Sequence, residues 1–128
     1  MAELTSGAHQ SSEASEQAAL MRWAAYQSGR YPQLLMLFHI PNGGSRNSRE
    51  AANLKRQGVK PGVPDLCLPV AAGGYHGLYI ELKRAHQGVV SAPQRDWIAA
   101  LRAQGYRAEV CRGWVAASEV IMDYLRGA

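Results

Sequence analysis

The clearest pattern along the chain is a pair of short apolar segments on either side of a glycine-bearing turn. Residues 66–68 and residues 78–84 are rich in Leu, Tyr and Ile, and the turn at residues 72–77 reads A-G-G-Y-H-G. Apolar runs of this length beside such a turn predict two β-strands. The simplest arrangement of the two strands is an antiparallel hairpin.

Charged residues interrupt this predicted hairpin. Asp65 lies at the entrance of the first strand, and Glu81 and Lys83 lie within the second. Side chains alternate along a strand, so Glu81 and Lys83 project from one face, roughly 7 Å apart, while Ile80 and Leu82 point the other way. If the hairpin brings Asp65 near Glu81, two carboxylates and an ammonium converge. Such a cluster is costly to bury and does little for a sheet, so it indicates a function.

A helical pattern precedes the hairpin near the start of the chain. It begins at Ser11 or Ser12 as N-cap and stops at Gly29. The inward stripe of this helix is apolar around Leu20, and Glu16, four residues earlier, falls on the same stripe. An acid there is a candidate ligand. The alternative is that the helix dipole favours an acid in the first turn, and helical position by itself favours that explanation.

Three further segments have helical patterns: residues 48–57 with Ser48 as cap, residues 93–104 and residues 118–125. Pro93 suits a first helical turn. Gln94 follows it and lies at the N-terminus of that helix, on a partly inward face.

Two more apolar runs predict strands, a buried one at residues 34–40 and a short one at residues 107–111. His39 lies near the end of the first of these strands, where a core position is favoured over a site position. The element order is α-β-α-β-β-α-β-α, which predicts an α/β fold with a mixed sheet and helices on both faces.

Length and composition indicate one globular domain. The chain has 128 residues, of which 47% are hydrophobic and 19% charged. Residues 1–11 have no periodicity and are expected to be a flexible tail, so the domain is expected to span residues 12–128. No run approaches the ~18 apolar residues of a membrane span, and no signal peptide is visible, so we expect a cytoplasmic protein. Cys67 and Cys111 are isolated, which indicates core cysteines and no zinc site.

A net charge of +4 is compatible with a polyanionic partner. The most basic stretch lies just before the hairpin, and Glu50 is its only acid. A solvated helix face and a set of phosphate contacts are both open readings of that stretch. Its basic residues are Arg46, Arg49, Lys55, Arg56 and Lys60.

The charged cluster suits metal-assisted hydrolysis of a phosphodiester. Carboxylate oxygens are the ligands that Mg²⁺ and Mn²⁺ prefer. Such an ion lowers the pKa of a bound water from about 15.7 towards neutrality, and a nearby lysine stabilises developing charge. The string Pro-Asp followed by acid-x-Lys is weak by itself, but its placement on two apolar strands strengthens it. The alternative is an ion-paired edge hairpin without a catalytic role.

These residues resemble a known nuclease superfamily. Gly62-Val63-Pro64-Asp65-Leu66, followed by Tyr79-Ile80-Glu81-Leu82-Lys83, resembles the PD-(D/E)xK nucleases, and most closely their VRR-NUC (virus-type replication-repair nuclease) branch. The resemblance covers roughly residues 12–126 and implies a restriction-endonuclease-like three-layer α/β/α fold. It also implies a stand-alone domain similar to those of phages and prophages. Further positions resemble that branch: Asn42-Gly43-Gly44, Gly58, Ser91, Gln94, Gly105-Tyr106 and Cys111.

The resemblance implies a role for each matching residue. Asp65 and Glu81 would bind the metal together with the Leu82 carbonyl, and Lys83 would be the catalytic lysine. Gln94 would be the motif residue on the following helix.

The resemblance also implies an acid on the first helix, and Glu16 would be that metal ligand. Glu13, one turn earlier, is the alternative. Ser91 would make a supporting contact near Gln94 or DNA, and Asn42 joins the basic stretch as a candidate DNA contact.

The implied function is a Mg²⁺- or Mn²⁺-dependent DNA endonuclease, selective for branched or flapped DNA, in phage or prophage replication or repair. A domain this small has little surface to enclose a branched DNA, so we expect a homodimer similar to a Holliday-junction resolvase. The alternatives are a less selective nuclease that nicks or degrades DNA, and a DNA-binding replication-accessory module without the chemistry.

Overall fold

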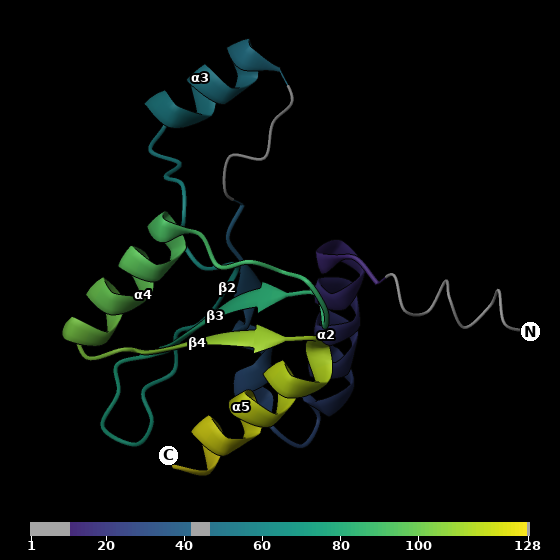
Figure 1. Cartoon of the computed structure of the whole chain (residues 1–128). Coiled ribbons are helices and arrows are strands. Elements are labelled where there is room, and N and C mark those ends of the chain that lie inside the picture. The colour runs from purple at the N-terminus through teal and green to yellow at the C-terminus, as the bar shows by residue number, and fades with distance from the viewer. Residues whose placement is uncertain (1–10, 42–46, 128) are drawn as a thin grey trace, which may run out of the picture.

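Four strands form one mixed sheet in the order β1-β2-β3-β4 (Figure 1). The computed structural model describes residues 11–41 and 47–127. The strands are β1 (Phe38–His39), β2 (Leu66–Leu68), β3 (Leu78–Lys83) and β4 (Arg107–Arg112). β2 pairs antiparallel with β1 and with β3, whereas β4 runs parallel to β3. The predicted hairpin and the predicted mixed sheet are therefore both confirmed.

Helices cover both faces of this sheet (Figure 1). Helices α2 (Glu13–Gln27) and α5 (Trp114–Arg126) pack on one face, and α4 (Ala92–Ala103) packs on the other. The alternation of β3 explains the two layers of core. Leu78, Ile80 and Leu82 join the cluster with α2 and α5, and Tyr79 joins the smaller cluster with α4.

The helix caps follow from local side chains in three cases. Ser12 caps α2 with a capping box, and Ser91 caps α4 in the same way. The cap of α3 (Ser48–Arg56) is Asn47, so the prediction of Ser48 was wrong by one residue. Asn47 accepts from the N–H groups of residues 49 and 50, which leaves Ser48 as the first helical residue.

The last helix begins four residues earlier than predicted, at Trp114. Its N-cap is Gly113, which has no side chain to mark a helix start. The acceptor comes instead from α2, because Glu16 Oε1 accepts from the Trp114 N–H at 2.8 Å. A cap supplied across 98 positions of sequence cannot be read from the local pattern.

The prediction of a buried strand over residues 34–40 was largely wrong. Pro32–Met36 form a 3₁₀ helix, η1, and only Phe38–His39 join the sheet. Pro32 fixes a helical φ at the start of this turn. Leu34 and Leu37 are buried at a spacing of three, while Leu35 is 74% exposed. A continuous apolar run has no period of its own, so it did not distinguish these two structures.

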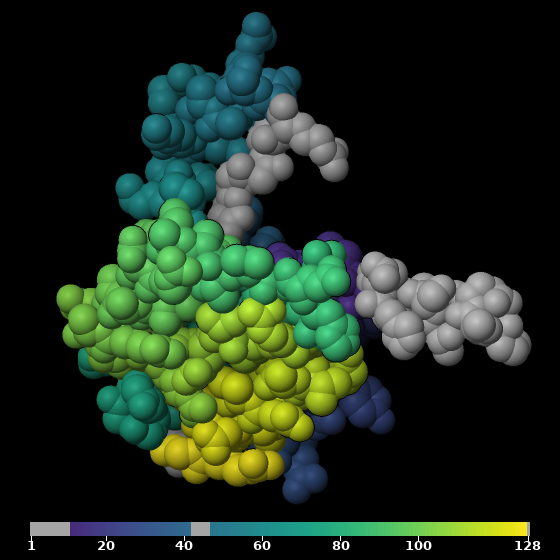
Figure 2. All heavy atoms as spheres, in the orientation of Figure 1, coloured from purple at the N-terminus to yellow at the C-terminus, as the bar shows by residue number. Residues whose placement is uncertain are grey.

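Helix α3 projects from the rest of the molecule (Figures 1 and 2). None of its residues is buried. We call residues 47–61 the α3 arm. The arm lies between two segments that meet at Asp65, because the Ile40 N–H donates to the Asp65 carbonyl oxygen at 2.7 Å. The first ten residues of the tail predicted at residues 1–11, and Asn42 and Arg46, lie outside the described residues.

Candidate active site

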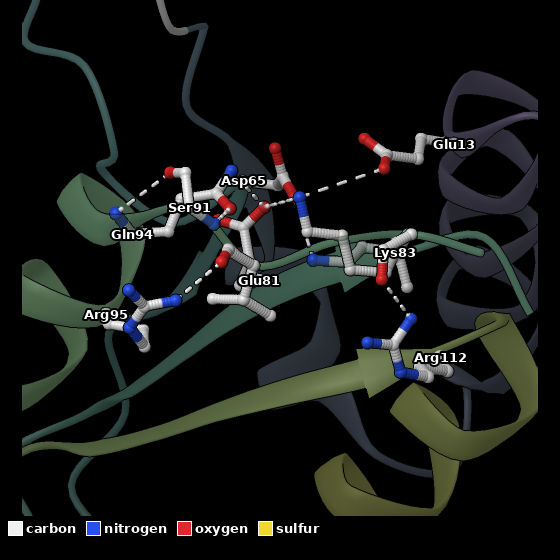
Figure 3. A network of polar contacts seen from close by, with 11 residues as sticks. Glu13, Asp65, Glu81, Lys83, Ser91, Gln94, Arg95 and Arg112 are labelled. Atoms are coloured by element: carbon white, nitrogen blue, oxygen red, sulfur yellow. Dashed lines mark hydrogen bonds and ion pairs between the residues drawn. The ribbon is translucent and has the colours of Figure 1, made fainter. Parts of the chain in front are cut away.

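The hairpin register brings the two predicted carboxylates together. Leu66 is paired with Ile80, so continuing the register by one residue places Asp65 opposite Glu81. Asp65 Oδ2 accepts from the Leu82 N–H at 2.7 Å (Figure 3). This bond fixes the first carboxylate against the strand that carries the second.

Glu81 is 1% exposed, although its side chain can carry a charge. Its Oε2 accepts from Gln94 Nε2 at 3.1 Å and lies 3.7 Å from Lys83 Nζ (Figure 3). Its Oε1 has no hydrogen-bond partner within the described residues. A buried carboxylate oxygen without a donor is costly when ionised, so this atom indicates a cation or donor that binds at the site.

The surroundings of Glu81 raise the pKa of its carboxyl from an ordinary 4.5 to about 8. Burial is the largest cause, followed by the negative charge of the neighbouring Asp65. Lys83 acts in the opposite direction, since its positive charge favours the ionised form. Burial and the neighbouring acid therefore favour the protonated form of this carboxyl when no metal is bound.

Lys83 is buried next to the two acids nearest to it. Its side chain is 7% exposed, and its Nζ lies 3.7 Å from Glu81 Oε2 and 3.9 Å from Glu13 Oε2. Glu13 comes from the first turn of α2 and is about half exposed. The ammonium thus lies between a buried acid of the sheet and an exposed acid of the helix (Figure 3).

Gln94 connects the helix cap to the buried carboxyl. Its Oε1 accepts from the Ser91 N–H at 2.9 Å, and its Nε2 donates to Glu81. The Ser91 side chain in turn accepts from the Gln94 N–H at 3.3 Å. The predicted contact of Ser91 with Gln94 is therefore present, and the cap orients the amide toward Glu81.

Gly62 brings the start of α4 close to the strand that begins at Asp65. A Cβ on Gly62 would lie 2.5 Å from the Pro93 carbonyl carbon, far inside contact distance. Gly62 also has φ +89°, a conformation that favours glycine. The first residue of the Gly-Val-Pro-Asp motif therefore allows Asp65 and Gln94 to belong to one site.

The two acids of α2 lie in different surroundings. Glu16 is buried, as its place on the inward stripe predicted. However, its Oε2 accepts from the Ser11 hydroxyl at 2.6 Å and its Oε1 accepts from the N–H of Trp114. Glu16 therefore joins α2 to α5, whereas Glu13 is the acid of this helix that is ion-paired with Lys83.

The basic residues of the arm do not join this cluster. Arg49, Lys55, Arg56 and Lys60 are exposed on the α3 arm. His39 is also exposed, so the prediction of a core histidine was wrong. β1, to which it belongs, is a two-residue strand at the edge of the sheet, and both of its residues are exposed. The His39 Nδ1 lies 2.9 Å from the Asp65 carbonyl oxygen.

The donors of the site fit a hard divalent cation. No three His, Cys, Asp or Glu side chains gather as a preformed metal site in the described part of the chain. Asp65 and Glu81 nevertheless provide carboxylate oxygens, one of them without a donor. The Leu82 carbonyl lies at the same edge, since the N–H and C=O of one strand residue point to the same side and its N–H donates to Asp65. An all-oxygen set of this kind suits Mg²⁺ or Mn²⁺.

The cysteines are not part of this site. Cys67 and Cys111 are both free and buried. Burial raises the pKa of the Cys111 thiol to about 12, so this thiol stays protonated. Both cysteines are packing residues, as the sequence predicted.

Comparison with known proteins identifies the family. The model of the VRR-NUC domain matches residues 11–114. The chain belongs to the VRR-NUC family, a nuclease family. A solved structure titled "VRR_NUC domain protein" is similar with a TM-score of 0.80 and 35% sequence identity, over 92% of this chain and 91% of that one. No curated protein matches the chain.

The VRR-NUC match agrees with the resemblance that the Gly62–Leu66 and Tyr79–Lys83 motifs carry. It also agrees with the observed α/β fold. Separately, no helix within residues 11–41 and 47–127 has both the length and the apolar character needed to cross a membrane.

Two arginines that contact the segment after Lys83 were not predicted from the sequence. Arg95 and Arg112 each donate to a backbone carbonyl of the segment between β3 and α4 (Figure 3). Local sequence contains no signal for the Arg112 contact, because it depends on how a later strand aligns with β3.

Proposed function

We propose that this VRR-NUC protein is a divalent-metal-dependent DNA endonuclease that hydrolyses phosphodiester bonds. The observation that supports this most directly is Glu81, a buried acid with one carboxylate oxygen lacking a donor, beside Asp65 and Lys83. In this proposal Asp65, Glu81 and the Leu82 carbonyl hold Mg²⁺ or Mn²⁺. The bound ion supplies Lewis acidity, which lowers the pKa of a bound water and offsets charge at phosphorus.

The side chains around the ligands have separate tasks in this proposal. Lys83, held near Glu81 and Glu13, donates to a phosphate oxygen on which negative charge develops, or orients the attacking water. Gln94 donates to Glu81 and so fixes the carboxylate in one orientation. Burial excludes water from the acid and the ammonium, which strengthens their electrostatic interactions.

We assign the helical acid of the site to Glu13. The 3.9 Å contact with Lys83 supports this, and both oxygens of Glu16 have donors elsewhere. Glu13→Gln is expected to lower the cleavage rate at least tenfold with little effect on Tm. Glu16→Gln is expected to lower Tm and leave the rate of the folded fraction within about threefold. A lower cleavage rate in Glu16→Gln together with a lower Tm in Glu13→Gln would instead assign Glu16 as the acid of the site.

The α3 arm is the proposed DNA-contacting surface, with Ser91 at the start of α4 nearer the site. The arm carries four described basic residues and one acid, and none of the residues of α3 is buried. Exposed Lys and Arg side chains of this kind neutralise phosphates without reading sequence. Asn42 and Arg46, outside the described residues, remain candidate contacts on the same basis.

The substrate we propose is branched or flapped DNA, cut by a homodimer in phage or prophage replication or repair. The small surface of one domain supports the dimer, since two sites on one branched DNA require two copies. Size-exclusion chromatography with light scattering tests this point, and a monomer at micromolar concentration would contradict it.

The deciding experiment is cleavage of end-labelled linear, flapped and four-way DNA with Mg²⁺ or Mn²⁺. Wild type, Asp65→Ala and Lys83→Ala are compared on each substrate. Cutting of flapped or four-way DNA by wild type alone is expected. Equal cutting of all three substrates would indicate a non-selective nuclease. Binding without cutting would indicate an accessory module, and equal activity of the variants would mean that the site is misassigned.

A further inference from the structure

The segment that joins β3 to α4 crosses the side chain of Lys83. We call residues 84–90 the strap. A Cβ on Gly88 would lie 3.0 Å from Lys83 Cβ and 3.3 Å from Lys83 Cδ, so the backbone of the strap rests on the aliphatic stem of the lysine. Such close approach is possible because residue 88 has no side chain. The strap is thus one reason why Lys83 is buried although it lies at the end of a strand.

Two arginines hold the strap by its carbonyl groups. Arg112 Nη1 donates to the Gly88 carbonyl oxygen at 2.6 Å, and Arg95 Nη1 donates to the Val90 carbonyl oxygen at 2.8 Å. Gln87, next to Gly88, has φ 69°, the only positive φ of a non-glycine residue in the described part of the chain. That conformation costs about 1 kcal/mol. The strap therefore depends on contacts made from outside it.

Arg112 has an unusual position relative to Lys83. β3 and β4 are parallel, and Arg112 is the direct cross-strand partner of Lys83. Like charges at such positions repel. The Arg112 guanidinium instead donates to Gly88, and no ion pair of Arg112 is present within the described residues. The hydrogen bond from Arg112 to Gly88 thus holds the strap against Lys83, the residue paired with Arg112 on the neighbouring strand.

We propose that Arg112 is a positioning residue for Lys83. By holding the Gly88 carbonyl it keeps the strap over the lysine stem, so that the ammonium extends toward Glu81 and Glu13. A free lysine side chain has many rotamers, and the strap removes most of them before substrate binds. The positional part of this inference stands on the contacts alone, and its catalytic consequence rests on the proposed nuclease function.

Lysine reactivity tests the position without any need for nuclease activity. The chain has three lysines, Lys55, Lys60 and Lys83, and the first two are exposed. Trace acetylation of the full chain, followed by mass spectrometry, gives a relative rate for each. In wild type, Lys83 is expected to react at least tenfold more slowly than Lys55. Arg112→Ala is expected to raise the Lys83 rate at least fivefold and to leave Lys55 and Lys60 unchanged.

Arg107→Ala is the matched control, since it removes the same charge from the other end of β4. Arg107 contacts Glu109 and Asp123, and within the described residues its ion pairs do not involve the strap. The Lys83 rate in this control is expected to equal that of wild type. An unchanged Lys83 rate in Arg112→Ala would overturn the proposal, and so would an equal rise in both variants.

Gly88→Ala provides a second route if Arg112→Ala does not fold. It retains Arg112, but its methyl group would meet Lys83 Cβ at 3.0 Å and lift the strap. The same rise in Lys83 reactivity is expected. No rise in a folded Gly88→Ala protein would overturn the proposal.

Cleavage kinetics test the catalytic consequence. Arg112→Ala is expected to lower kcat about tenfold with KM within twofold, and Arg112→Lys to recover part of kcat. A raised KM with unchanged kcat would make Arg112 a phosphate contact and overturn the positioning role. A wild-type protein without nuclease activity would refute the proposed function, while the acetylation rates would still decide the position of Lys83.

Discussion

Lys83 and Lys55 carry the same charge in opposite surroundings. Lys83 lies under the strap with its side chain 7% exposed, between a buried acid and an exposed one. Lys55 lies on the α3 arm, where no residue of the helix is buried. The first lysine belongs to a buried cluster in which the pKa of Glu81 is raised, and the second to a surface where water and salt screen each charge.

This difference separates chemistry from binding in the proposed enzyme. Burial of these charged groups lowers the stability of the fold. Such clusters occur at functional sites, where charged groups act with little screening by water. The α3 arm has no comparable cost, because a solvated cation contributes little to folding. Substitutions in the two regions should therefore change different measured quantities.

The largest expected effect is the loss of cleavage on removing a member of the buried cluster. Lys83→Ala or Asp65→Ala should lower kcat at least about 1,000-fold, roughly 4 kcal/mol of transition-state stabilisation. Binding of the same DNA without divalent metal should stay within about threefold, measured by fluorescence anisotropy. Lys55→Ala is the matched control and should retain kcat. A loss of kcat in Lys55→Ala similar to that in Lys83→Ala would remove the distinction between the two lysines.

The second effect concerns the proton on Glu81 in metal-free protein. Its pKa is about 8 when folded and near 4.5 when unfolded, so between these values the folded chain binds more protons. The stabilisation of the fold by the protonated Glu81 carboxyl is fully present below about pH 4.5 and is lost as the pH rises through about 8. We expect the free energy of unfolding to fall by about 4 kcal/mol across this range.

Glu81→Gln should remove most of that pH dependence, because the amide has no proton to lose. The measurement is chemical denaturation in EDTA at several pH values. Glu119→Gln, at an exposed position on α5, is the control and should behave as wild type. Identical pH dependence in Glu81→Gln and wild type would mean that another group causes it.

The third effect compares a glycine of the arm with the glycine at its junction with the body. Gly58 has φ +101° and nothing within 4 Å of a Cβ, whereas Gly62 has φ +89° and would meet Pro93 at 2.5 Å. Gly58→Ala should cost about 1 kcal/mol or less, from the backbone conformation alone. Gly62→Ala should cost about 2 kcal/mol more, measured by urea denaturation. Equal costs would mean that α4 moves freely away from residue 62.

The smallest effect is the one on DNA binding by the α3 arm. Replacing Arg49 and Lys55 with Ala should reduce the slope of log K against log salt by about one unit for each lost phosphate contact. Stability should change by less than about 0.5 kcal/mol, since both residues are exposed. The control replaces Arg22 and Arg126, exposed on α2 and α5, with Ala. An unchanged slope in the arm variant would mean that Arg49 and Lys55 lie on a solvated helix face and do not contact phosphates.

Local signals were sufficient for much of the fold and for part of the site. The period of two in Tyr79–Lys83 placed Glu81 and Lys83 on one face. The serines before α2 marked its start, and Pro93 marked the start of α4 to within one residue. Local signals failed in two places. The apolar run beginning at Leu34 had no period that could distinguish a strand from a 3₁₀ helix. The start of α5 depended on a hydrogen bond to Glu16, which is distant in the sequence.

By itself, the sequence determined the hairpin, its charged residues and the family to which the chain belongs. It did so because turn chemistry, alternation and motif spacing act over a few residues. Only the tertiary structure decided that Glu13 and not Glu16 is paired with Lys83, and that Arg112 holds the strap over that lysine. Those contacts depend on the packing of α2 against α5 and on the register of β4 against β3. Such long-range geometry follows from the whole core and from no single segment.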